Sequence, residues 1–187
     1  MRTTYWSKNY IRRLKELSMA TPQARKSLDL LIQSYEYTRL KVLDTTRELH
    51  QLALEDRYKD QIALIRSVPG IGQIGALLLL TEIGDFNRFR GIDQLCCYIG
   101  LIPNTKSSGE HDRTAGLSYR GHPKLREILI EASWTAIRQD PALTLAFTNY
   151  CRKMKKNQAI IKIAKKVLSR LRFVMKHQTP YVSSVVE

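Results

Sequence analysis

Apolar side chains recur every three or four residues between Pro22 and Arg66, and this spacing predicts one long amphipathic helix. Thr21 offers a side-chain oxygen that can cap the first turn, and Pro22 suits the first helical position. The apolar seam repeats in heptads, which is typical of a coiled coil, although two of its positions are threonines. The seam positions are Leu28, Leu31, Tyr35, Thr38, Val42, Thr45, Leu49 and Leu52.

A seam of this length needs a second helix to cover it. One partner is a second copy of the chain, and the other is a shorter N-terminal helix around Trp6, Tyr10, Leu14 and Leu17. Because the arm is much longer than that helix, we favour self-association. The sequence therefore predicts a homo-oligomer held together by the coiled coil.

The remainder of the chain predicts a compact helical domain over residues 67–176, after an arm at 1–66 and before a tail at 177–187. Helices are expected on both sides of residues 69–72, then at about 93–99, 123–139, 141–154 and 158–176. Residues 102–122 are dominated by polar and turn-forming types, so we expect an irregular loop with at most a short hairpin. The predicted fold class is all-α: a long coiled-coil arm followed by a compact helical domain.

The turn between the first two of these helices reads Pro69-Gly70-Ile71-Gly72. A glycine adopts the positive φ that such a turn needs, and it has no side chain to block an approaching ligand. A turn of this pattern is typical of a helix-hairpin-helix, in which the amides of Gly70, Ile71 and Gly72 point at a DNA phosphate. A plain connection between two buried helices is the alternative.

The chain has a formal net charge of +14, and the basic excess is uneven. No acidic residue lies between Pro141 and Val186, a stretch that holds ten lysines and arginines. Such a distribution indicates binding to nucleic-acid phosphates, although charge alone would also suit an acidic membrane surface. On the polar side of the last helix, we expect Lys162, Lys165, Lys166 and Arg170 to contact DNA.

Composition argues against several other classes of protein. No apolar run approaches the roughly 20 residues of a membrane helix, and the N-terminus lacks the apolar stretch of a secretion signal, so we expect a cytoplasmic protein without a membrane partner. Cys96, Cys97 and Cys151 fit neither a disulfide framework nor a zinc spacing, so we expect buried thiols. Glu82 and Asp85 lack a third ligand, so no metal site is predicted.

Three stretches, taken together and in order, resemble a known family. They read SVPGIGQIGALLLLTEIGDFNRF from Ser67, QLCCYIGLIPNTKSSGE from Gln94 and GLSYRGHPKLREILIEASW from Gly116. They are similar to the C-terminal transposase domain of the insertion-sequence one-ten (one-sixteen / nine-oh-two) transposases. The resemblance covers about residues 60–175, and the arm at 22–66 is similar to the coiled coil that precedes this domain in the family.

The resemblance implies a DNA transposase or recombinase whose serine attacks a phosphodiester and forms a phosphoserine link. The family's serine–glycine pair falls on Ser108 and Gly109, so Ser108 is the expected nucleophile and Ser107 is the alternative. A serine hydroxyl needs activation, and the charge on phosphorus needs nearby cations. From their place in the same loop, we assign that role to Lys106, Arg113 and Arg120.

The sequence departs from the family pattern at two points. An asparagine of the family is replaced by His122. Family members also begin with a RuvC-like nuclease domain whose four acidic residues hold magnesium, and no stretch here matches that domain. We therefore expect a fragment of a longer protein, or the remnant of a degraded element, with no cofactor of its own and with magnesium bound only by the absent domain. The resemblance also implies a structured guide RNA as a partner. In the family, much of the binding of this RNA is done by the nuclease domain that is absent here.

Two further hypotheses stay open beside strand transfer. The chain could be a helix-hairpin-helix module that grips DNA without cutting it, or a purely structural coiled-coil protein. A phosphate-binding protein loses affinity steeply as salt rises, which separates the structural protein from the other two. A covalent protein–DNA adduct would separate strand transfer from simple binding. We expect strand-transfer activity only when the chain is joined to its nuclease domain.

Overall fold

A computed structural model describes residues 6–108, 111–117 and 120–183, and for the strands within 103–117 it describes the backbone. The chain divides into two units, residues 1–49 and 50–187. Helices dominate both units, and the only strands in the described part form one hairpin. The predicted all-α class is therefore confirmed, with the short hairpin in the polar segment.

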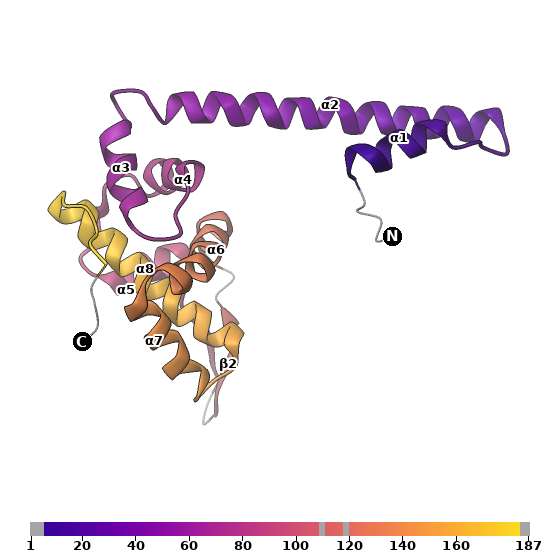
Figure 1. The fold of residues 1–187 in the computed structure, drawn as a ribbon. Helices are drawn as coiled ribbons and strands as arrows, with labels where there is room; N and C mark the ends of the chain where they lie inside the picture. The colour runs from indigo at the N-terminus through magenta and orange to yellow at the C-terminus, as the bar shows by residue number, and fades with distance from the viewer. Residues whose placement is uncertain (1–5, 109–110, 118–119, 184–187) are drawn as a thin grey trace. The chain divides into compact units, whose positions relative to one another are not determined.

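The helix α2 (Pro22–Leu52) forms the arm (Figure 1). Its cap is the predicted one, because Thr21 Oγ1 accepts a hydrogen bond from the amide of Ala24 at 3.2 Å. The helix ends at Leu52, however, whereas the sequence predicted that it would continue to about Arg66. Ala53 is buried at this corner, and residues 53–58 turn the chain without any glycine or proline, so the heptad pattern gave no sign of the break.

The short helix α1 (Lys8–Glu16) runs back along the first part of α2 (Figure 1). Ile11 and Ile32 are both buried in this unit, and Lys15 Nζ lies 2.7 Å from the carboxylate of Glu36. Ile32 lies outside the predicted heptad seam, and the N-terminal segment meets the seam at Tyr35, whose ring lies 5.2 Å from that of Trp6.

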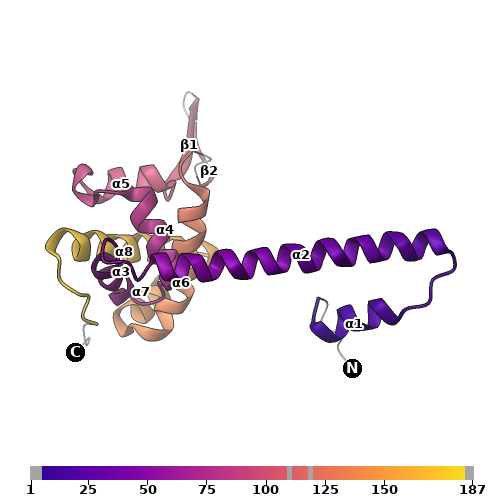
Figure 2. The same cartoon turned by 90° about the horizontal axis from the view of Figure 1, so that it is seen from above.

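The second unit is built around α8 (Lys156–His177), which lies among the other helices (Figures 1 and 2). It contacts α3 (Lys59–Ser67), the 3-10 helix η1 (Phe86–Arg88), α5 (Ile92–Ile99), α6 (Pro123–Gln139) and α7 (Pro141–Cys151). The helix α4 (Gln73–Ile83) packs against α3 and α6. The buried face of α8 consists of Ala159, Ile160, Ile163, Ala164, Val167, Leu168, Leu171, Val174 and Met175. This stripe has helical spacing, so the core forms along one face of the most basic helix.

Most helix ends in this unit lie where the sequence placed them. Gly84 ends α4 with a φ of +64°, and Gly100 ends α5 in the left-handed region with a φ of +83°. The bounds of α6 match the prediction, whereas α7 ends at Cys151 instead of Met154. No helix in the described residues is long and apolar enough to cross a membrane.

The three cysteines do not all fit the expectation of buried thiols. Cys96 is buried, Cys151 is half-buried and Cys97 is exposed. The difference arises because consecutive residues of a helix point about 100° apart, so Cys96 and Cys97 of α5 cannot both face the core. Burial raises the pKa of the Cys96 thiol, which keeps that thiol protonated at neutral pH.

The C-terminal segment folds back over the second unit. The amide of Tyr181 donates to Ser67 Oγ at 2.7 Å, and its hydroxyl donates to Asp140 Oδ2 at 2.6 Å. Asp140 is fully buried, accepts from the amide of Leu143 at 3.1 Å and lies 3.5 Å from Arg170 Nη2. A buried carboxylate needs such partners, so Asp140 fixes the point where α7, α8 and the C-terminal segment meet.

Candidate nucleic-acid interface

The glycine turn between α3 and α4 is held against α6. Gly70 has a φ of +88°, and a Cβ atom at this position would lie only 2.1 Å from the carbonyl oxygen of Ala132. The side chain of Ile71 is buried, which anchors the middle of the turn in the core. The first glycine of the predicted DNA-binding turn is therefore required by packing, whatever else the turn does.

The second glycine has a different environment. Gly72 lies in the extended region with a φ of −80°, and nothing lies within 4 Å of the position that its Cβ would take. No side chain caps α4 at this end. The open start of α4 is thus the part of the turn that has room for a phosphate, and the amide contact itself stays a prediction.

The polar segment forms an antiparallel hairpin of β1 (Pro103–Ser108) and β2 (His111–Leu117), which extends away from the helices in Figure 2. The register pairs Lys106 with Arg113 and Ser108 with His111. Two of the predicted catalytic cations are thus brought opposite each other, two residues before the predicted nucleophile. The side chains of residues 103–119 lie outside the described part of the chain, so a contact between them and Ser108 stays a prediction.

Two glycines hold the base of the hairpin against α5. A Cβ atom on Gly121 would lie 2.6 Å from the amide nitrogen of Gly100, and one on Gly100 would lie 2.6 Å from the carbonyl oxygen of Arg120. Arg126 Nη1 donates to the carbonyl of Gly100 at 3.1 Å. Arg120 is therefore at the base, whereas Ser108 is at the far end of β1. Five strand residues span about 15 Å, so proximity in sequence overstated how close these two residues come.

A cluster of aromatic and charged side chains lies next to this base, and the sequence analysis did not single it out. The Tyr98 ring lies 5.1 Å from that of His122 and 5.4 Å from that of Phe89, and the Arg88 guanidinium lies 4.7 Å from the Tyr98 ring. His122 Nδ1 is 3.7 Å from the carboxylate of Glu82. Arg88 lies in η1 and Phe89 directly follows it, whereas His122 caps the start of α6. Because the cluster is built from elements far apart in the sequence, the departure at His122 was the signal for it.

The four cations predicted to contact DNA from α8 differ in their surroundings. Lys162 and Lys166 are exposed, and Lys165 is half-buried. The side chain of Arg170 is only 20% exposed and lies beside the buried Asp140. Of these four cations, Lys162 and Lys166 are thus the most accessible to a ligand, while Arg170 also holds the fold together.

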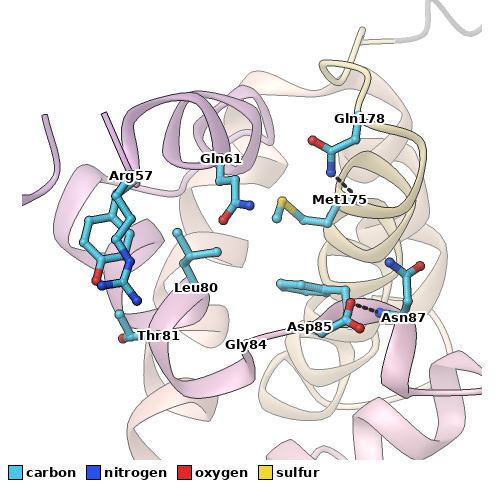
Figure 3. A pocket seen from close by; sticks show the side chains of 11 residues that line it. Arg57, Gln61, Leu80, Thr81, Gly84, Asp85, Asn87, Met175 and Gln178 are labelled. Atoms are coloured by element: carbon cyan, nitrogen blue, oxygen red, sulfur yellow. Dashed lines mark hydrogen bonds between the residues drawn. The ribbon is translucent and has the colours of Figure 1, made fainter. Parts of the chain in front are cut away.

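A cavity of about 710 Å³ lies between α3, α4 and the end of α8 (Figure 3). Leu80 and Met175 supply apolar walls, and Arg57 and Gln61 supply polar ones. Asp85 is already engaged, because it accepts a hydrogen bond from the amide of Asn87 at 2.8 Å. None of the residues predicted to bind DNA or to react lines this cavity.

Carboxylates do not assemble into a metal site in the part of the chain that the structure describes. No group of three histidine, cysteine, aspartate or glutamate side chains comes together there as metal binding requires.

Residues 62–148 match the model of the family described as Transposase IS116/IS110/IS902 family. This part of the chain is therefore similar to the domain that the family model describes. The matched range begins in α3, includes the glycine turn, the hairpin and α6, and ends in α7. The basic helix α8 lies beyond it.

Several curated relatives are also similar to this chain over part of its length. A putative transposase of Sinorhizobium fredii is 32% identical over 46% of this chain and 25% of its own length. A transposase for an insertion sequence element, IS1111A, of Coxiella burnetii is 30% identical over 63% of this chain and 32% of its own length. The transposase for IS1328 of Yersinia enterocolitica is 30% identical over 60% of this chain and 33% of its own length. The chain thus spans between a quarter and a third of the length of these relatives.

The two glycines of the turn should respond very differently to substitution. Gly70→Ala should lower the free energy of unfolding by about 2 kcal/mol or more, because it combines a strained φ with overlap against the Ala132 carbonyl. Gly72→Ala should cost at most about 1 kcal/mol, the range of a cap residue exchange. Urea denaturation followed by circular dichroism measures both. Equal losses would contradict the packing role assigned to Gly70.

Proposed function

We propose that this chain is the strand-transferring part of a DNA transposase and that Ser108 is its nucleophile. The observation that carries the proposal is the family match over residues 62–148, which includes the glycine turn and the hairpin. The relatives whose names refer to insertion-sequence transposases support it. In this proposal DNA is the substrate, and the exposed start of α4 and the outer face of α8 hold it.

The proposed reaction is a phosphoryl transfer in two balanced steps. Ser108 Oγ attacks a phosphorus atom of DNA, the Oγ–P bond forms, and the P–O bond to one strand end breaks. The serine proton is lost to a base or to solvent, and the departing oxygen takes up a proton to become a free hydroxyl. A hydroxyl of another strand end then attacks the phosphoserine, which rejoins the DNA and restores Ser108. The bond energy is conserved throughout, so no nucleotide is consumed.

The register of the hairpin supports an anionic substrate at this place. Like charges directly opposite each other destabilise a strand pair, and Lys106 and Arg113 are such a pair. A phosphate beside them would relieve that repulsion and would receive positive charge where the transition state develops negative charge. Lys106 and Arg113 are therefore better placed along the strands for this role than Arg120.

A covalent adduct tests the nucleophile. The chain is incubated with DNA from the two ends of its own insertion element, and denaturing electrophoresis looks for a protein–DNA adduct. Ser108→Ala should abolish the adduct, with affinity for the same DNA within about twofold of wild type because a hydroxyl adds little to phosphate-backbone binding.

Ser107→Ala is the matched control, because it removes the neighbouring hydroxyl and should leave the adduct in place. If Ser107→Ala alone abolished the adduct, the nucleophile would be reassigned. If the wild type bound DNA but formed no adduct, while a full-length relative formed one with its own element ends, the chain would be a non-catalytic DNA-binding module.

The role of α8 is tested by the salt dependence of DNA binding. Each lysine that contacts a phosphate contributes about 0.9 to the slope of log affinity against log salt. The double variant Lys162→Gln, Lys166→Gln should therefore flatten this slope by about 1.8, as measured by fluorescence anisotropy on duplex DNA.

The control for this test removes two charges elsewhere. Arg47 and Lys59 each lie close to a carboxylate, at 3.1 Å from Asp44 and 2.6 Å from Asp56. Replacing both with glutamine should leave the slope nearly unchanged. If both double variants flattened the slope equally, net charge and not the α8 face would govern binding.

We also propose that the arm joins two copies of the chain. Leu31 and Val42 belong to the predicted seam, and they are 69% and 59% exposed. They are separated by 11 residues, which is three turns of a helix, so both lie on one side of α2. A second copy of α2 would cover this strip with apolar contacts along its length.

Self-association is tested with two pairs of substitutions that are alike in chemistry. Leu31→Ser with Val42→Ser should weaken dimerisation at least tenfold in sedimentation equilibrium, because each loses apolar contacts worth about 1 kcal/mol or more. Leu30 and Leu40 are 55% and 60% exposed and lie on other sides of α2. Changing both of these leucines to serine should leave the dimer intact. A wild type that stays monomeric at high concentration would contradict the proposal.

A further inference from the structure

A groove runs between the outer face of α8 and the C-terminal segment. Its volume is about 490 Å³, and it is lined by Ser169, Arg170, Phe173, Pro180, Tyr181 and Val182. The wall formed by the C-terminal segment is fixed, because Tyr181 is hydrogen-bonded both to Ser67 and to the buried Asp140. The groove is thus a feature of the folded domain and does not need a ligand to form.

The lining of the groove is largely apolar and offers aromatic rings. Phe173 is 58% exposed, and its ring centroid lies 4.4 Å from that of His177. On the other side, the Arg170 guanidinium lies 5.1 Å from the ring of Tyr181. Planar rings of this kind favour a flat ligand that can stack on them, because stacked π-systems gain attraction beyond simple burial.

Positive charge surrounds this apolar surface. Phe173 lies seven residues after Lys166 and three before Lys176, so the three share the outer face of α8. Neither α8 nor the C-terminal segment as far as residue 183 contains an acidic residue. Arg170 Nη1 is buried and has no hydrogen-bond partner among the described residues. The ligand that complements the groove therefore combines a flat ring with negative charge.

We propose that this groove holds one unpaired base of DNA, stacked on Phe173, while the phosphates on either side of it lie against Lys166 and Lys176. The inference rests on the proposed DNA binding by α8 and makes it more specific. A nucleotide carries both the planar ring and the anionic backbone that the groove requires, and aromatic stacking accepts any of the four bases. An acidic peptide would match the charge and would leave the stacking surface unused.

Two DNA hairpins that differ in one group test the proposal. Both carry a single-nucleotide bulge in the same duplex, and one bulge holds a thymine while the other holds an abasic site. The full chain should bind the thymine bulge roughly tenfold more tightly in fluorescence anisotropy, which is within the range that stacking of one base supplies. A fully paired hairpin serves as the reference for the duplex contacts.

Substitutions at Phe173 identify the stacking surface. Phe173→Leu keeps the apolar character and removes the ring, so the preference for the thymine bulge should disappear while affinity for the paired hairpin stays unchanged. Phe173→Tyr keeps a ring and should retain the preference. Leu145→Ala changes another apolar side chain, 49% exposed on α7, and should leave all three affinities as they are. Thermal unfolding of each variant checks that the fold is retained.

The outcomes separate this inference from the proposed function. Binding of the paired hairpin with equal affinity for the two bulges would overturn the inference alone and would assign the groove to a protein segment or a second copy. If the Phe173→Leu variant still preferred the thymine bulge to the abasic bulge, the inference would be overturned as well. Tighter binding of the same bulged hairpin made of RNA would also overturn it. Failure of the wild type to bind any of the DNAs would overturn the proposed function together with the inference.

Discussion

The arrangement of this domain depends on backbone segments that approach each other more closely than a Cβ atom allows. At Gly70 the turn before α4 meets the carbonyl of Ala132, and at Gly121 the end of the hairpin meets the backbone of Gly100. Both contacts attach a connecting segment to a helix without side chains between them. The positions of the turn and of the hairpin base are consequently set by main-chain geometry, which tolerates little change.

A second constraint acts at the other end of the core. Asp140 is fully buried, and its carboxylate would be costly there without hydrogen bonds and a nearby cation. The amide of Leu143, the hydroxyl of Tyr181 and the guanidinium of Arg170 supply them. One carboxylate thereby orders the start of α7, the outer part of α8 and the segment that forms one wall of the groove. The most basic helix is anchored through its acidic neighbour, while Lys162 and Lys166 stay exposed.

Sequence reasoning succeeded where a signal is local and failed where the fold decides. The cap at Thr21, the glycine that ends α5 and the apolar stripe of α8 all follow from neighbours within a few residues, so they could be predicted. The end of α2 at Leu52 could not, because the residues that follow include no helix breaker and the corner is set by burial of Ala53. The exposure of Cys97 depends on which face of α5 meets the core, which composition does not reveal.

The candidate site illustrates the same division in its chemistry. Placing Lys106, Arg113 and Arg120 together required only that they share one loop, but a hairpin separates residues by their place along the strands. Its register brings Lys106 and Arg113 opposite each other near Ser108 and leaves Arg120 at the base with Gly121. Coulomb interactions in water weaken steeply over 15 Å, beyond the screening length at physiological salt. In the proposed reaction, positive charge for a phosphate at Ser108 would therefore come from the strand pair itself or from another molecule, whereas Arg120 lies at the hairpin base, where its carbonyl meets Gly100.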